Sequence, residues 1–232
     1  MNTFTADEAI LPTRGGDWDD GGLWRNLFTH NWGTNNDLII GTWDYLYGVI
    51  VQCNQSIDKL VSLKEQDPEN EYYEIYRSEV RAIRAMYYYY LLDMFARVPI
   101  VESSLTQMAD VKQSERTDVF NFVKKELEES IPLLEDAKSA ENGEFYGRMT
   151  KAAAYFLMAK LALNAEVYTD NDWTDNVRPD GKNIKFTVDG QEMNCWEATV
   201  AYCDKVKACG YALNLGTVSY THLRAHETRH DL

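Results

Sequence analysis

The chain has 232 residues, of which 45% are hydrophobic, and it carries a formal net charge of −14 at pH 7. This length is enough for one sizeable core, or for a helical domain with part of a second one. The acidic excess excludes nucleic acids and anionic lipid surfaces as main partners, because their phosphates are bound mainly by Lys and Arg. Neutral ligands such as sugars carry no such penalty. No run of about 18 apolar residues occurs, so no segment is expected to span a bilayer.

The four cysteines, Cys53, Cys195, Cys203 and Cys209, do not form a metal-binding pattern. None of them forms a C-x-x-C pair, and no His lies at ligand spacing from them. We expect buried free thiols, no metal site and no cofactor.

Residues 3–36 are rich in Gly, Asp, Asn and Trp, especially between Arg14 and Gly22. Clustered Gly and Asp are typical of turns, so this region is expected to be a long structured loop rather than helix. Asp17, Asp19 and Asp20 are close enough in sequence to offer oxygen ligands to Ca²⁺. Their spacing is not that of an EF-hand, and solvated turn residues are the favoured interpretation.

Two long helices are predicted next, over residues 37–63 and 69–95, and they should form an antiparallel hairpin. Asn35 or Asn36 would cap the first helix. Arg81 and Arg84 lie largely off the apolar stripe of the second helix and are expected to bond loop carbonyls or carboxylates. The Tyr87–Tyr90 run is expected to be mostly core.

Three shorter helices follow. One should begin near Thr117 as N-cap and end or kink at Pro132, one should cover residues 150–168, and one should cover 196–208 and close at Gly210. Within the polar insertion 169–195, a short strand over 185–188 and a turn are predicted. The expected fold class is mostly α, with TPR-like helical pairs and long irregular loops.

The composition changes from Val218 onward, where three of the four histidines of the chain lie, namely His222, His226 and His230. This break is typical of an unnatural junction, and the string resembles translated adaptor DNA. We expect residues 1–217 to be an incomplete helical domain and residues 218–232 to be a non-native tail. A histidine-rich metal-binding tail is the alternative.

Three blocks of the chain resemble the SusD/RagB family of nutrient-binding lipoproteins. They cover residues 7–32, residues 81–99 and residues 147–164, and a weaker match covers 196–211. The second block is the most specific, since its Arg81-Ala-Ile-Arg84-Ala-Met-Tyr87-Tyr helix leads into Val98-Pro99. The resemblance covers nearly all of residues 3–217 in the order of the family.

The resemblance implies a SusD-like helical fold and non-catalytic binding of an oligosaccharide or polysaccharide at the outward face of the cell outer membrane. It implies attachment through a lipid anchor that this chain lacks, and a SusC-like TonB-dependent transporter as partner. It also implies ligand contacts, because Trp32-x-x-Asn35 matches the Trp–Asn spacing of the starch-binding member and Arg14 lies upstream. Trp18 is a fourth candidate contact, although anchoring the loop together with Trp24 is its favoured role.

Two other functions remain open. A TPR-like protein–protein adaptor fits the helical pairs, but would not need long loops rich in Trp and Gly. An α-helical glycoside hydrolase would need two carboxyl groups flanking the scissile bond, and Glu8 with Asp17 or Asp20 are the candidates. No nucleophile, metal or phosphate-binding motif accompanies them, so we expect no enzyme activity.

Overall fold

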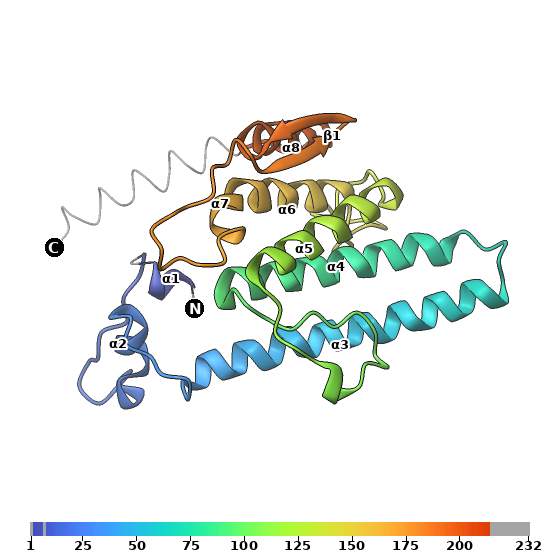
Figure 1. The fold of residues 1–232 in the computed structure, drawn as a ribbon. Coiled ribbons are helices and arrows are strands. Elements are labelled where there is room, and N and C mark those ends of the chain that lie inside the picture. Colours follow the sequence, from blue (N-terminus) through green and yellow to red (C-terminus); the bar gives the residue numbers. More distant parts are fainter. Residues whose placement is uncertain (1, 7, 214–232) are drawn as a thin grey trace. The chain divides into compact units, whose positions relative to one another are not determined.

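The computed structural model describes residues 2–6 and 8–213 of the chain (Figure 1). These residues form two compact units, which divide between Gln52 and Cys53 within one long helix. The described residues are mostly helical, with one short β-hairpin, so the predicted mostly α fold is confirmed. None of the described helices is both long enough and apolar enough to cross a bilayer. The tail predicted from Val218 onward lies outside the described residues.

In the first unit, short helices interrupt the predicted loop. They are α1 (Asn2–Thr5), the 3-10 turn η1 (Asp20–Gly22) and α2 (Leu23–Phe28). The prediction of turns without helix over residues 3–36 is therefore wrong at these places. Gly22 adopts a left-handed φ of 85°, which lets the chain turn directly into α2. Leu27 of α2 is then completely buried, so burial of its apolar side favours helix where the glycines alone indicated a turn.

The long helix α3 (Asp37–Gln66) begins where the sequence predicts it and extends slightly further. The side-chain oxygen of Asn36 accepts hydrogen bonds from the backbone N–H groups of Leu38 at 3.0 Å and Ile39 at 3.3 Å. Asn36, rather than Asn35, therefore satisfies the first free donors of the helix.

In the second unit, residues 53–66 of α3 and the helix α4 (Tyr72–Phe95) form the predicted hairpin. Lys64 closes the turn between them, since its ammonium donates to the carbonyl oxygens of Pro68 at 2.5 Å and Asn70 at 3.1 Å. The buried side chains of α4 recur at helical spacing: Ser78, Ala82, Arg84, Ala85, Tyr88, Tyr89, Leu91 and Leu92. The tyrosine run is half core, because Tyr88 and Tyr89 are buried whereas Tyr90 is exposed.

A buried guanidinium joins separate segments of this unit. Arg84, which is 3% exposed, donates to the Asn54 side-chain oxygen and to the Glu102 carbonyl, both at 2.8 Å. It also forms two hydrogen bonds to one carboxylate oxygen of Glu126, at 2.9 and 2.6 Å, while Arg81 binds the other oxygen. The structural role predicted for both arginines is confirmed, but Arg84 lies on the buried face of α4 and not off it.

Helix α5 (Arg116–Ser130) packs along α4 and passes into the 3-10 turn η3 (Ile131–Leu133) at Pro132. The prediction of Thr117 as its N-cap is wrong. Glu115 is the N-cap and shares a capping box with Asp118, so a carboxylate supplies the acceptor. The Thr117 hydroxyl instead donates to the Thr169 carbonyl at 3.0 Å and ties the helix start to the following insertion.

A second helical pair consists of α6 (Lys151–Leu163) and α8 (Cys195–Ala208), which lie side by side in Figure 1. Buried alanines of α6, namely Ala152, Ala154, Ala159 and Ala162, leave room for close packing. The helix predicted over 150–168 is interrupted at Asn164 and resumes as α7 (Ala165–Tyr168).

A β-hairpin directly precedes α8 in the chain and packs against this helix. It consists of β1 (Lys185–Val188) and β2 (Gln191–Asn194), with Val188 paired to Gln191. Asp189 and Gly190 form the turn with φ values of 53° and 77°, as a two-residue hairpin turn requires. The strand and turn predicted here are confirmed. Strand β2 was not predicted, because Met193 is its one apolar residue and a single apolar residue gives no alternating pattern.

Candidate functional site

The predicted contact residues Arg14 and Trp18 lie at a tight turn of the first unit. The backbones of Arg14 and Asp17 exchange two hydrogen bonds, at 3.1 and 3.0 Å, around Gly15 and Gly16. Trp18 follows directly with a φ of 64°, a conformation that side chains other than glycine rarely adopt. Its side chain is 54% exposed. The turn therefore holds a large aromatic ring in water at the cost of backbone strain, which is typical of functional loops.

Trp24 anchors this loop from α2. Its indole N–H donates to the Asp20 carboxylate at 2.7 Å, and its ring lies 5.2 Å from Phe4 and 6.5 Å from Trp18, between ring centroids. The rings of Trp18 and Trp24 meet edge to face, an arrangement that aromatic pairs favour. Trp24 is thus placed as an anchor, as predicted, and Trp18 is the member of the cluster that keeps an exposed surface.

Trp32 lies elsewhere in the first unit, beside His30 at a ring distance of 5.5 Å, and is 40% exposed. Asn35 and Arg14 are exposed as well. Within the described part of the chain, no hydrogen bond or ring contact joins Arg14, Trp18, Trp32 and Asn35 to one another. The structure therefore leaves all four accessible to a ligand without assembling them into one cavity, and their role as contacts stays a prediction.

Asp19 and Asp20, two of the candidate calcium ligands, accept hydrogen bonds from other side chains of the loop. Asp19 accepts a hydrogen bond from the Thr13 hydroxyl at 3.3 Å, and Asp20 is engaged by Trp24. Among residues 2–6 and 8–213, no three His, Cys, Asp or Glu side chains gather in a way that could hold a metal ion. Two of the three aspartates are thus bound by neighbouring side chains of the same loop.

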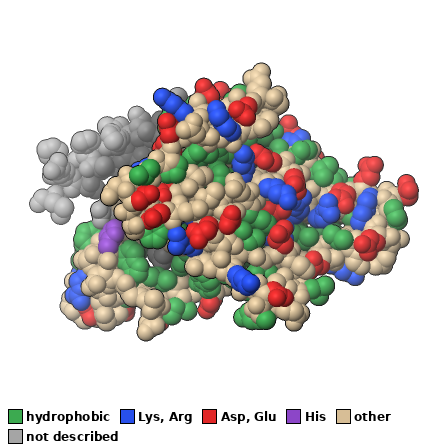
Figure 2. Space-filling view, viewed as in Figure 1, with side chains coloured by type: hydrophobic (Ala, Val, Ile, Leu, Met, Phe, Trp, Pro, Cys, Tyr) green, Lys and Arg blue, Asp and Glu red, His purple; other side chains and the backbone are tan. Residues whose placement is uncertain are grey.

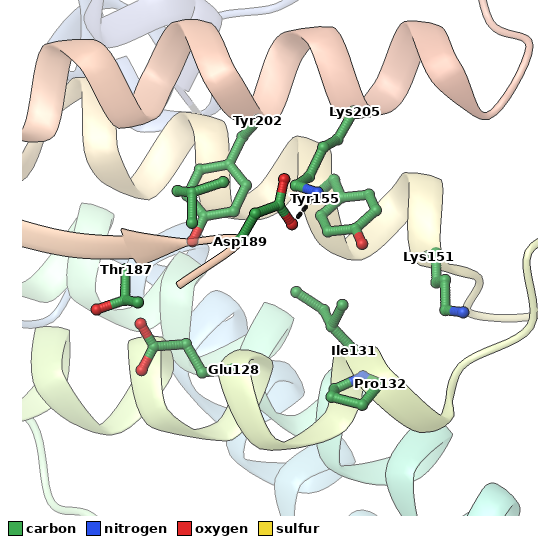
Figure 3. Close-up of a pocket in the computed structure, with 10 residues that line it drawn as sticks. Glu128, Ile131, Pro132, Lys151, Tyr155, Thr187, Asp189, Tyr202 and Lys205 are labelled. Carbon is green, nitrogen blue, oxygen red and sulfur yellow. Dashed lines mark hydrogen bonds and ion pairs between the residues drawn. The ribbon is translucent and has the colours of Figure 1, made fainter. Parts of the chain in front are cut away.

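The second unit contains a pocket that the sequence did not predict. It has a volume of about 490 Å³ and lies between α5, η3, α6, β1 and α8 (Figure 3). Its lining residues are Glu128, Ile131, Pro132, Lys151, Tyr155, Thr187, Val188, Asp189, Tyr202 and Lys205. They come from segments far apart in the sequence, so no local motif marks them.

Two tyrosines and four charged side chains are among the residues that line this pocket. The rings of Tyr155 and Tyr202 lie 6.3 Å apart and are tilted by only 28°. The Lys205 ammonium binds the Asp189 carboxylate at 2.6 Å and lies 5.3 Å from the Tyr155 ring centroid. Burial raises the pKa of the Tyr202 hydroxyl above its ordinary value, and the Glu128 carboxylate raises it further. The Tyr202 hydroxyl therefore keeps its proton at neutral pH and can act as a donor.

Glu128 stands at the side of the pocket with weak charge compensation. Its nearest cation is Lys124, at 3.8 Å. Burial raises the pKa of its carboxyl group, Lys124 lowers it, and the neighbouring Glu129 adds to the rise.

Over the visible face of the molecule, Lys and Arg are interspersed with Asp and Glu, and neither sign dominates (Figure 2).

Comparison with known proteins places these features in a family. Residues 17–163 match the model of a SusD-like family described as "Starch-binding associating with outer membrane". Over 120 residues the chain is 34% identical to the starch-binding protein SusD of Bacteroides thetaiotaomicron, which covers 52% of this chain and 20% of that protein.

Solved structures agree with this match. The surface glycan-binding protein A from Bacteroides uniformis is 28% identical, with a TM-score of 0.55, over 66% of this chain and 34% of that one. A SusD homologue from Bacteroides thetaiotaomicron shares the fold with a TM-score of 0.61 at 20% identity, over 88% of this chain and 35% of that one. The chain thus spans about a third or less of the length of these relatives. By its family match and its fold, it belongs to the SusD-like family.

Proposed function

We propose that this chain is part of a protein that binds glycans at the outward face of the outer membrane without cleaving them. The observation that carries the proposal is the pair of exposed tryptophans, Trp18 and Trp32, on polar loops of the first unit. The family description and the names of two relatives, which refer to starch and to surface glycans, support it. Attachment by a lipid anchor and delivery to a SusC-like TonB-dependent transporter are proposed with it.

A tryptophan ring offers a flat apolar face on which the C–H face of a pyranose can stack. Asn35 and Arg14 carry amide and guanidinium groups that can bond sugar hydroxyls at the rim. Stacking of nucleic-acid bases on aromatic side chains contributes about 1–3 kcal/mol per ring, and we take the same scale for sugars. The acidic net charge of −14 does not oppose a neutral ligand.

The test is affinity electrophoresis of the full chain in gels containing soluble starch, laminarin or xyloglucan. Trp32→Ala and Trp18→Ala should each weaken retardation by about 5- to 150-fold in apparent affinity, the equivalent of one lost stacking contact. Trp173→Ala is the matched control, because Trp173 lies in the second unit and is 61% exposed. Retardation that survives both loop variants unchanged would contradict the proposal.

The absence of catalysis is tested on the same preparations. Prolonged incubation with each polysaccharide should release no new reducing ends. Release that disappears in Glu8→Gln or Asp20→Asn would instead support a glycoside hydrolase, since that reaction needs paired carboxyl groups.

A further inference from the structure

The pocket of the second unit is balanced in charge. Two cationic groups, Lys151 and Lys205, and two carboxylates, Glu128 and Asp189, line it. Lys205 and Asp189 already neutralise each other at 2.6 Å. A charged ligand would be repelled by the two lining groups of its own sign, whereas a neutral polar ligand would not be repelled by either pair. Balanced charge therefore favours an uncharged molecule in this pocket.

The hydroxyl of Tyr202 is the second observation. Tyr202 is only 3% exposed, and its hydroxyl has no hydrogen-bond partner among residues 2–6 and 8–213. The hydroxyl itself is not sealed from solvent, because it opens onto the pocket, so it can exchange a water contact for a ligand hydroxyl. Figure 3 shows this hydroxyl pointing toward the same space as the Glu128 carboxylate, from α8 and α5 respectively. A ligand hydroxyl located between them would satisfy both groups.

The remaining lining groups fit the same kind of ligand. Tyr155 also lacks a hydrogen-bond partner within the described residues, and Thr187 adds a further hydroxyl from β1. Ile131 and Pro132 supply an apolar floor. The volume of about 490 Å³ falls within the range of roughly 300–1,000 Å³ that is typical of small-molecule sites. Hydroxyl groups surrounding an apolar surface match the amphipathic character of a sugar ring.

We propose that this pocket is a second carbohydrate site, which takes one or two residues of a neutral sugar. It is built from the second unit alone and is distinct from the tryptophan loops of the first unit. Tyr202 and Glu128 bond the sugar hydroxyls, and Thr187 bonds at the rim. The inference rests on the chemistry of the pocket, and it shares only the class of ligand with the function proposed above.

The experiment is an NMR titration of the ¹⁵N-labelled full chain with maltose and, separately, with cellobiose. We expect saturable shifts at the backbone amides of Thr187, Val188 and Lys205 with at least one of these sugars. Tyr202→Phe removes one hydroxyl and keeps the ring, and should weaken binding about two- to tenfold. Glu128→Gln keeps the size of the side chain at a more exposed position, and should weaken binding to a similar extent.

Controls separate this site from the loops and from other ligands. Tyr146→Phe changes an exposed tyrosine outside the pocket, and should leave the pocket shifts unchanged. Trp32→Ala should also leave them unchanged while it weakens polysaccharide retardation. Saturable shifts with inorganic phosphate but not with sugar would overturn the inference, as would pocket amides that stay silent with both sugars. If either outcome occurred while Trp32→Ala still weakened polysaccharide retardation, the pocket proposal would fail and the function proposed for the tryptophan loops would remain supported.

Discussion

At the scale of residues, Glu126 is a buried charge that joins two helices of the second unit. It is 3% exposed and compensates two guanidinium groups, those of Arg81 and Arg84. A buried ion pair of this kind contributes little relative to a well-packed apolar core. Removal of one partner is costly, however, because the other charge stays buried without compensation.

We therefore expect Glu126→Ala to lower the free energy of unfolding by about 3–5 kcal/mol. Chemical denaturation followed by circular dichroism measures this change. Glu129→Ala is the matched control, since Glu129 also binds Arg81 at 2.5 Å but is mostly accessible, and a loss of at most about 1 kcal/mol is expected there. Equal losses for the two variants would show that burial does not decide the effect.

Asp58 links α3 to the segment after the buried Val98. Its carboxylate accepts hydrogen bonds from the Ser103 hydroxyl and from the backbone and side chain of Ser104, at 3.1, 2.8 and 2.6 Å. Burial pulls its pKa upward, but these bonds and the nearby Arg84 outweigh it, so the pKa lies below its ordinary value of 3.8. The folded chain therefore stabilises the ionised Asp58 carboxylate more than the unfolded chain does.

Because the folded pKa is depressed, the contribution of Asp58 is fully present above the ordinary pKa and is lost as pH falls through the folded value. We expect Asp58→Asn to destabilise the chain at pH 7 and to have a shrinking effect below about pH 4. Denaturation midpoints of both proteins across this range test it. A difference that stays constant down to the most acidic pH would contradict the assignment.

At the scale of elements, the N-terminal cap of α8 stabilises a helix that forms one wall of the candidate pocket. Asn194 caps α8, and its side-chain oxygen accepts from the backbone N–H groups of Trp196 and Glu197, both at 3.0 Å. The Glu197 carboxylate in return accepts from the Asn194 N–H at 3.0 Å. This capping box fixes the start of the helix that carries Tyr202 and Lys205.

Asn194→Ala should therefore cost about 1 kcal/mol of stability and loosen the first turn of α8. Amide hydrogen exchange at Trp196 and Glu197 should become faster, because their N–H groups lose their acceptor. Asn183→Ala, at an exposed asparagine outside the helix caps, should change neither quantity appreciably. Unchanged exchange at both amides in Asn194→Ala would mean that the cap does not protect them.

At the scale of the whole molecule, the sequence predicted the long elements well, because their apolar periodicity reflects the packing that stabilises them. Helices α3 and α4 are the best examples. The predictions failed where a tertiary contact decides the local structure, as with the Glu115 cap of α5 and the burial of Arg84. An ionised side chain in a core leaves no periodic signal, because its partners lie elsewhere in the sequence.

The candidate sites differ in the same way. The loop residues Arg14, Trp18, Trp32 and Asn35 were accessible to sequence reasoning, because they lie in one short stretch and resemble a family pattern. The pocket around Tyr202 was not, since its walls come from α5, α6, β1 and α8. A single sequence does not show which of its tyrosines will line such a pocket after folding.

The position of Arg84 has a consequence for the order in which the second unit assembles. Its acceptors Asn54, Glu102 and Glu126 are spread over more than seventy residues of chain, and all must arrive before the guanidinium is dehydrated at tolerable cost. The hairpin of α3 and α4 supplies only Asn54 to this guanidinium, whereas α5 brings both the Glu126 carboxylate and the Phe122 ring. We therefore expect dehydration of Arg84 to accompany the docking of α5 rather than the closing of the hairpin.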